Sequence, residues 1–321
     1  MNSSSSLNKT ESGENNEDVF WKVVSYIALV ECAIGIISNS LLLLLTYCNP
    51  LNNLRKSSWI TITNLALADL LTSILSIFFC HPVYELALLP ERDIQHACTE
   101  VLLHIGYASS FFLLMLFAIE RYIAIKHPFE SGNILTRKRI FLACFLCWAA
   151  AIGCALPIIL RSQEFIIALY GILEFSALVM ILFQVLIIKG IKEASRHLED
   201  GSTRKAHMKN VSTTIVILIL VLMVTTFPYF IAKQVEFLYR DYPNLFTGKV
   251  ARLFPYYYFP IACLNFIVNP FIYALRLPDY RNALRELLNR KLLNRETRAE
   301  RNSNRFSSRR RLQEKSIMTT C

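Results

Sequence analysis

Seven apolar stretches, each long enough to cross a lipid bilayer, constrain the fold of this chain more than any other feature of its sequence. The hydrocarbon core of a bilayer is about 30 Å thick, and a helix needs roughly 20 residues to cross it. Backbone groups in lipid must be hydrogen-bonded within the segment, which a helix achieves and an open strand does not. We therefore predict an all-α fold, a seven-transmembrane helix bundle. The predicted spans are residues 23–47, 58–80, 99–125, 139–160, 165–188, 211–237 and 251–275.

The composition agrees with lipid as the main solvent. Hydrophobic residues make up 54% of the 321 residues and charged residues 18%, whereas a soluble domain has about 25% charged residues. So few charges cannot cover a water-facing surface, which excludes a disordered chain, a coiled coil and a secreted disulfide scaffold. The net charge of +10 is compatible with nucleic-acid binding, but the basic residues lie between apolar stretches and in the C-terminal region. That placement indicates membrane topology, so we expect no nucleic-acid partner.

The distribution of Lys and Arg predicts the orientation. One set of inter-span segments, together with the span ends that border them and the C-terminal region, holds 26 of the 34 basic residues, which places that side in the cytoplasm. The prediction is a multi-pass plasma-membrane protein with an extracellular N-terminus and a cytoplasmic C-terminus. Its parts are an extracellular N-terminal tail at 1–22, the bundle at 23–275, a short amphipathic helix at 276–290 and a disordered basic tail at 291–321. Asn2 and Asn8 each start an N-glycosylation motif on the predicted outer side. Glycosylation of at least one of them and of neither are equal alternatives.

Asp69 is a carboxylate in the middle of the second span, where a charge is expensive and therefore suggests a function. No basic residue lies at a comparable depth in any other span. Polar residues of other spans lie at similar depth, namely Asn39, Ser110, Asn265 and Asn269. Hard cations prefer oxygen ligands, so we predict a Na⁺ site at Asp69, Ser110, Asn265 and Asn269. A water-filled polar network without an ion is the alternative.

Two motifs lie near the predicted inner surface. The third span ends with Glu120-Arg121-Tyr122, whose adjacent acid and arginine can pair and then separate. In the seventh span, Pro270 removes a backbone donor and bends the helix. We expect the side chain of Asn269 to bond the carbonyl that this proline frees, with Tyr273 one turn further on. Pro228 is expected to kink the sixth span in the same way.

These residues together resemble the rhodopsin-like (class A) G-protein-coupled receptors, over about residues 23–290. The pattern also includes Trp148 in the fourth span, and residues 133–139 and 273–276 look most like melanocortin-type receptors and their adenosine-receptor relatives. The resemblance implies that an extracellular ligand shifts the bundle between two packings and opens an inner cavity for a heterotrimeric G protein. It assigns coupling and activation to Glu120, Arg121, Tyr122, Pro228, Asn269, Pro270 and Tyr273. Arrestin and a receptor kinase are expected at the tail, and lipid around the bundle.

The resemblance also implies a ligand pocket at the outer ends of the spans. Glu100, Leu103, His104 and Tyr107 share one face of the third span, because they follow at i, i+3, i+4 and i+7. The residues expected opposite them are Tyr229, Phe230, Lys233, Tyr256 and Phe259. A carboxylate among aromatic rings suits a cationic group, so we expect a peptide or a small amphipathic molecule. An aromatic belt at the bilayer edge is the alternative reading of the tyrosine run.

The sequence departs from the class at three positions that bear on activation. The sixth span reads Thr225-Thr226-Phe227-Pro228, without the usual tryptophan, and Phe227 or Phe230 is the expected substitute. Phe183 falls where the class has a tyrosine in the fifth span. The inner end of the sixth span has no acid to hold Arg121, so Glu120 is its expected partner and we predict ligand-independent signalling.

Two other classes of function remain open. The lost tryptophan and tyrosine also fit a non-signalling or decoy receptor. A transporter is the less favoured alternative, because carriers usually have internal repeats and the halves of this chain show none. Metal-ligand spacing, a nucleophile elbow and a phosphate loop are all missing from the sequence, so we expect no enzymatic activity and no cofactor apart from the proposed Na⁺.

Overall fold

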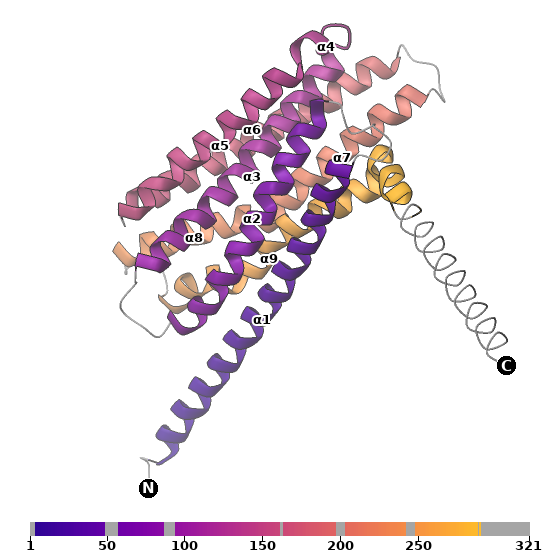
Figure 1. Ribbon diagram of the computed structural model, residues 1–321. Helices are drawn as coiled ribbons and strands as arrows, with labels where there is room; N and C mark the ends of the chain where they lie inside the picture. The colour runs from indigo at the N-terminus through magenta and orange to yellow at the C-terminus, as the bar shows by residue number, and fades with distance from the viewer. Residues whose placement is uncertain are drawn as a thin grey trace, which may run out of the picture.

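The computed structural model describes residues 4–48, 57–86, 94–160, 163–196, 203–241, 248–287 and 289. Within these ranges the regular structure is helical throughout, as predicted, and the helices form one elongated bundle (Figure 1). They are α1 (Ser4–Cys48), α2 (Ser57–Leu86), α3 (Ile94–Lys126), α4 (Ser131–Ile134), α5 (Arg137–Ala155), the 3-10 helix η2 (Leu156–Leu160), α6 (Gln163–Arg196), α7 (Thr203–Thr225), α8 (Phe227–Asp241) and α9 (Gly248–Arg276).

Seven segments of the described chain are long and apolar enough to cross a membrane, which confirms the predicted bundle. The fourth span consists of α5 and η2, and the sixth consists of α7 and α8. The limits of the spans differ from the predicted limits by six residues or fewer. Membrane-spanning helices extend past their apolar stretch, as α6 does by continuing to Arg196, so apolarity alone does not locate their ends.

The two ends of the bundle are distinct. We call the end at which the first, third, fifth and seventh spans begin the outer end, and the opposite end the inner end. The first helix, α1, projects beyond the outer end, whereas α4 lies at the inner end (Figure 1). The helix α1 begins at Ser4, so it includes most of the predicted tail. Asn2 lies outside the described residues, as do 291–321, and the side chain of Asn8 is also outside them.

Two glycines allow α2 to pack very closely against α1 and α3. A Cβ atom placed on Gly35 of α1 would lie 2.5 Å from the Ser73 hydroxyl of α2, and one placed on Gly106 of α3 would collide with the Thr72 hydroxyl. Small residues at helix crossings are a usual way to gain packing contacts in lipid. The third helix is the most deeply buried span, so side chains from α3 meet side chains from most other spans.

A short helix follows the seventh span at the inner end. Residues 278–287 are helical, with Pro278 in the first turn, where the missing N–H is tolerated. Tyr280 is buried and stacks on Trp59 of α2, with ring centroids 6.4 Å apart. Arg281 and Arg285 are exposed on the other side. This helix falls within the segment 276–290 for which an amphipathic helix was predicted.

Candidate functional site

Tyr107 of α3 lies at the centre of an aromatic cluster in the outer half of the bundle. Its ring centroid is 6.3 Å from that of Tyr229, 6.2 Å from Phe230 and 4.7 Å from Phe266. Phe259 of α9 adds a contact to Tyr229 at 6.0 Å. The structure therefore brings together aromatic residues that the sequence assigned to one pocket, from the third, sixth and seventh spans.

His104 connects this cluster to the fifth span. Its Nδ1 lies 2.7 Å from the Glu100 carbonyl and its Nε2 lies 2.8 Å from the Tyr170 hydroxyl. A carbonyl only accepts, so Nδ1 donates, and in the neutral ring Nε2 then accepts from Tyr170. Glu100 and Lys233 are near enough for their charges to act on His104. The third and sixth spans thus bring opposite charges to the edge of the aromatic cluster.

The remaining predicted pocket residues differ in their surroundings. Leu103 is buried in the core. Lys233 pairs with Glu236 one turn away at 2.8 Å, and both side chains are partly exposed. Tyr256 belongs to α9, but its side chain lies outside the described part of the chain. Phe230 rather than Phe227 packs against Tyr107 in the cluster, and Phe230 is almost completely buried whereas Phe227 is half-buried.

Sequence reasoning missed Tyr170 and left Glu174 unassigned. The Tyr170 ring stacks on Phe230 at 5.0 Å, and one turn later Glu174 accepts a hydrogen bond from Gln234 of α8 at 3.3 Å. The signal was an aromatic and an acid four residues apart in an aliphatic span, which places both on one side of the helix. Two polar atoms here have no hydrogen-bond partner among the described residues, the Tyr107 hydroxyl and Glu174 Oε1.

Asp69 is fully buried and joins three spans. Its Oδ1 accepts from the Ser110 hydroxyl of α3 at 2.8 Å, and its Oδ2 accepts from the Asn269 amide of α9 at 2.7 Å. Asn265 is also buried, but its amide nitrogen has no partner among the described groups. The carboxylate, the Ser110 hydroxyl and the amide oxygen of Asn269 are the kinds of oxygen that bind a hard cation. The oxygen atoms of these residues are therefore chemically suited to bind a Na⁺ ion.

The expected role of Asn269 at the seventh-span kink was wrong. Pro270 frees the carbonyl of Phe266, four residues earlier, and Asn39 of α1 donates to that carbonyl at 2.8 Å. Asn39 also donates to the Gly35 carbonyl of its own helix at 3.0 Å. The amide of Asn269 instead bonds Asp69, because its side chain points away from its own backbone and toward α2.

The sixth-span kink has the same chemistry with a different donor. Residue Thr226 interrupts the span between α7 and α8, and Pro228 frees the carbonyl of Val224. The hydroxyl of Tyr258 in α9 donates to that carbonyl at 2.5 Å. The helix is therefore interrupted next to Pro228, and a side chain of the seventh span satisfies the carbonyl that this proline frees.

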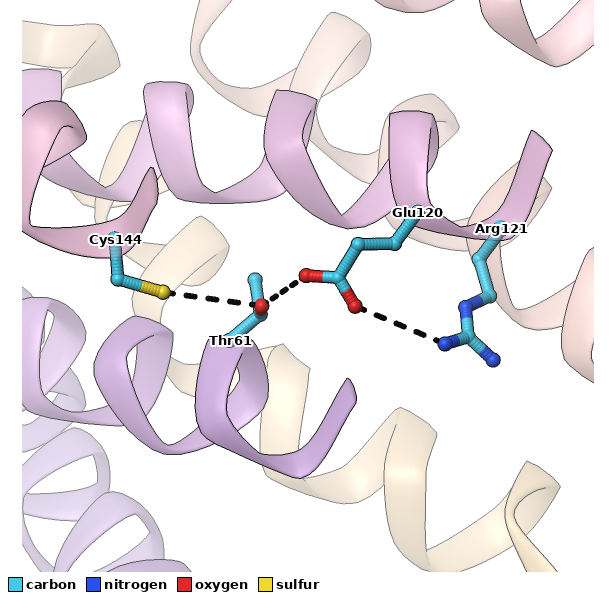
Figure 2. Close-up of polar contacts among 4 residues, drawn as sticks. All are labelled: Thr61, Glu120, Arg121 and Cys144. Carbon is cyan, nitrogen blue, oxygen red and sulfur yellow. Dashed lines mark hydrogen bonds and ion pairs between the residues drawn. The ribbon is translucent and has the colours of Figure 1, made fainter. Parts of the chain in front are cut away.

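Glu120 at the inner end has a partner that the sequence did not reveal. Its Oε1 accepts from the Thr61 hydroxyl of α2, and its Oε2 lies 3.8 Å from the guanidinium of Arg121 (Figure 2). The Cys144 sulfur of α5 lies 3.8 Å from the same Thr61 oxygen. Neighbouring residues on a helix do not face each other, which explains why Glu120 reaches across to α2 more closely than to Arg121.

Arg121, Tyr122 and Tyr273, which were also predicted to act in activation, differ in their surroundings. The Arg121 guanidinium lies over the Phe117 ring, 5.3 Å from its centroid, and Arg121 Nε has no hydrogen-bond partner among the described residues. Tyr122 packs edge-on against Phe183 of α6, with centroids 5.7 Å apart. Tyr273 is fully buried, and its hydroxyl likewise has no partner in the described part of the chain.

The chain is similar to two families of seven-transmembrane receptors and to several individual receptors. Residues 38–168 match the family described as 7 transmembrane receptor (rhodopsin family), and residues 149–288 match the serpentine type 7TM GPCR chemoreceptor Srsx family. The chain is 25% identical to the allatostatin-A receptor of Bombyx mori over 87% of this chain and 82% of that receptor. It is 24% identical to melanocortin receptor 5 of Homo sapiens, over 74% and 75% of the two chains. It is also 24% identical to somatostatin receptor type 5 of Bos taurus, over 83% and 76%.

Proposed function

Because the chain belongs to the rhodopsin family of seven-transmembrane, G-protein-coupled receptors, we propose that its outer aromatic cluster binds an extracellular peptide. The observation that carries this proposal is the buried cluster around Tyr107, with Glu100, His104 and Lys233 at its edge. Aromatic rings beside groups of both charges suit a ligand that has apolar and ionic parts together. The named relatives, receptors for peptide ligands, support the same choice over a small amphipathic molecule.

The unpaired polar atoms suggest how such a ligand is held. The Tyr107 hydroxyl and Glu174 Oε1 are each buried without a hydrogen-bond partner among the described residues. Leaving such groups unpaired costs about 1–3 kcal/mol each. A ligand that supplies a carbonyl to Tyr107 and an N–H or a cationic group to Glu174 recovers that energy. These two atoms give a peptide backbone and a basic side chain separate places to bind.

Signal transmission to the inner end is assigned to the family motif residues. In this proposal the ligand favours one packing of the bundle, and the inner half of the sixth span moves outward from its kink at Pro228. Arg121 then leaves Glu120, and the Gα subunit binds beside Arg121, Tyr122 and Tyr273. Asn269 and Pro270 connect this movement to Asp69, where a Na⁺ ion stabilises the inactive packing.

Location and further partners complete the proposal. The charge distribution supports a plasma-membrane receptor with its N-terminus outside, modified at Asn2 or Asn8, and with its C-terminal region inside. The serine-rich basic tail is proposed as a substrate for a receptor kinase and then as a site for arrestin. The helix at residues 278–287 is proposed to lie on the lipid of the inner leaflet. We propose no enzymatic activity.

A screen of peptides against cells that express the receptor and a promiscuous Gα subunit tests this function. A peptide that raises the second-messenger signal is expected, and Tyr107→Phe and Glu174→Gln should each weaken its potency about tenfold or more. Arg121→Ala should abolish the signal while peptide binding persists. The peptide assignment is overturned if only non-peptide compounds activate the receptor. Binding without any nucleotide exchange on Gα would instead favour a decoy receptor.

A further inference from the structure

We propose that Thr61 is a positioning residue that sets the basal activity of this receptor, because its hydroxyl holds Glu120 away from a full ion pair with Arg121. The inference rests on the coupling to G protein that the family carries out, and it concerns the receptor without a ligand. The residues involved are the four drawn in Figure 2.

The contact geometry shows a carboxylate shared unequally between two partners. Thr61 donates directly to Glu120 Oε1, whereas Glu120 Oε2 lies 3.8 Å from Arg121 and makes no hydrogen bond within the described residues. Two lysine–glutamate pairs in the described part of the bundle are closer, at 3.0 Å for Lys126 with Glu193 and 2.8 Å for Lys233 with Glu236. Arg121 is therefore held loosely although an acid is its neighbour in sequence.

The direction of the hydrogen bonds follows from the number of protons available. A threonine hydroxyl has one proton, and an ionised carboxylate only accepts, so the proton of Thr61 is directed to Glu120. The contact between Cys144 and Thr61 at 3.8 Å then has the thiol as its donor. The result is a chain of donors from the fourth span to the second and from the second to the third. Thr61 and Cys144 are both buried, so little water competes for these bonds.

Removal of the Thr61 hydroxyl should strengthen the pair between Glu120 and Arg121. A buried carboxylate oxygen without a donor is unfavourable, and the Arg121 guanidinium is a charged donor that already lies 3.8 Å from the other oxygen of Glu120. An arginine can bind both oxygens of a carboxylate at once. Once Oε1 is released, the carboxylate can turn toward Arg121 and fix it in the inactive position. Thr61 thus keeps Arg121 available to a G protein.

The test compares basal nucleotide exchange on Gα for variants in membranes without any ligand, corrected for the number of receptors at the surface. Thr61→Val keeps the shape of the side chain and removes the donor, and it should lower basal exchange about tenfold. Thr61→Ser keeps the donor and should retain wild-type exchange. Thr63→Val is the matched control on the same helix, because the Thr63 hydroxyl bonds only the Trp59 carbonyl of its own helix among the described contacts. Cys144→Ala removes only the weaker contact and should change exchange less than about twofold.

A second background separates positioning from a general structural effect. In receptors that carry Glu120→Gln, Thr61→Val should have no further effect on basal exchange, because the acid that Thr61 positions is absent. An equal drop in that background would overturn the proposal. So would unchanged or raised exchange in Thr61→Val, or a wild-type receptor without measurable basal exchange. Because no ligand is used, a failure of the peptide proposal leaves this test unaffected.

Discussion

Pro228 in the sixth span and Pro270 in the seventh each free one backbone carbonyl, and a side chain of a neighbouring helix donates to each of them. At Pro270 the donor is the buried amide of Asn39, which also bonds its own helix and lies one turn from the close contact at Gly35. At Pro228 the donor is the hydroxyl of Tyr258, which is only partly buried. The helix is continuous through Pro270, whereas the sixth span is interrupted at Thr226.

This difference indicates which kink can change shape. The seventh-span kink is fixed from two sides, by Asn39 from α1 and by Asp69 through Asn269 from α2. The sixth-span kink depends on one hydroxyl at the edge of the bundle. We therefore expect α9 to act as a support during activation, and the sixth span to be the element whose bend changes.

The largest effect is expected from Asn39→Ala. This variant leaves the Phe266 carbonyl buried and unpaired, which should lower the free energy of unfolding by about 2–3 kcal/mol. A drop of several degrees in the thermal unfolding of the purified receptor would show this. Ser38→Ala is the control, because the Ser38 hydroxyl bonds only Gly35 of its own helix at 3.2 Å among the described contacts. Equal losses in the two variants would contradict the role assigned to Asn39.

Sodium should act on the seventh-span kink through Asp69. If Na⁺ binds Asp69, Ser110 and Asn269, replacing choline chloride by sodium chloride at constant ionic strength should lower basal exchange about fivefold or more. Asp69→Asn removes the charge that binds the ion, so exchange in this variant should not depend on which cation is present. Glu31→Gln, which alters a carboxylate of α1, is the matched control and should keep the sodium effect. A sodium response that survives in Asp69→Asn would reject the ion site.

A somewhat smaller effect is expected from Tyr258→Phe. The ring keeps its stack on Phe254, whose centroid lies 5.5 Å away, and only the hydrogen bond to Val224 is lost. Loss of about 1 kcal/mol from the resting shape of the sixth span should raise basal exchange by up to about fivefold, with little change in unfolding temperature. Tyr26→Phe on the exposed face of α1 is the control. If Tyr258→Phe destabilised the receptor as much as Asn39→Ala, the contrast between the two kinks would be false.

The smallest effects come from restoring the missing backbone donors. Pro228→Ala returns an N–H that can bond Val224, so Tyr258→Phe should raise basal exchange less than twofold in that background. In the same way, Asn39→Ala should cost less stability when Pro270 is replaced by Ala. Full additivity in both double variants would show that neither side chain acts by satisfying the freed carbonyl.

The sequence predicted the spans, because the length of an apolar stretch shows whether it can cross a bilayer. It also predicted the depth of the polar residues, because depth follows from the position of a residue within its span. Depth was sufficient to group Asp69 with Ser110 and Asn269. It did not show that Asn39 turns toward Phe266, because the direction in which a side chain leaves its helix depends on how the helices are rotated. Thr61 and Tyr170 were missed for the same reason. Each is an ordinary neutral residue until a neighbouring helix places Glu120 or His104 against it.

The close contacts at Gly35 and Gly106 have a mechanical consequence. A helix pair without room for one extra methyl group resists sliding, so we expect the first three spans to move together as one rigid group, with α9 beside them as the support. Volume for a guest molecule at the outer end, and for a protein at the inner end, then has to be created on the side of α6 to α8. Gly106→Ala should accordingly loosen the packing of α3 against α2, so that the resting and active shapes of the bundle differ less clearly.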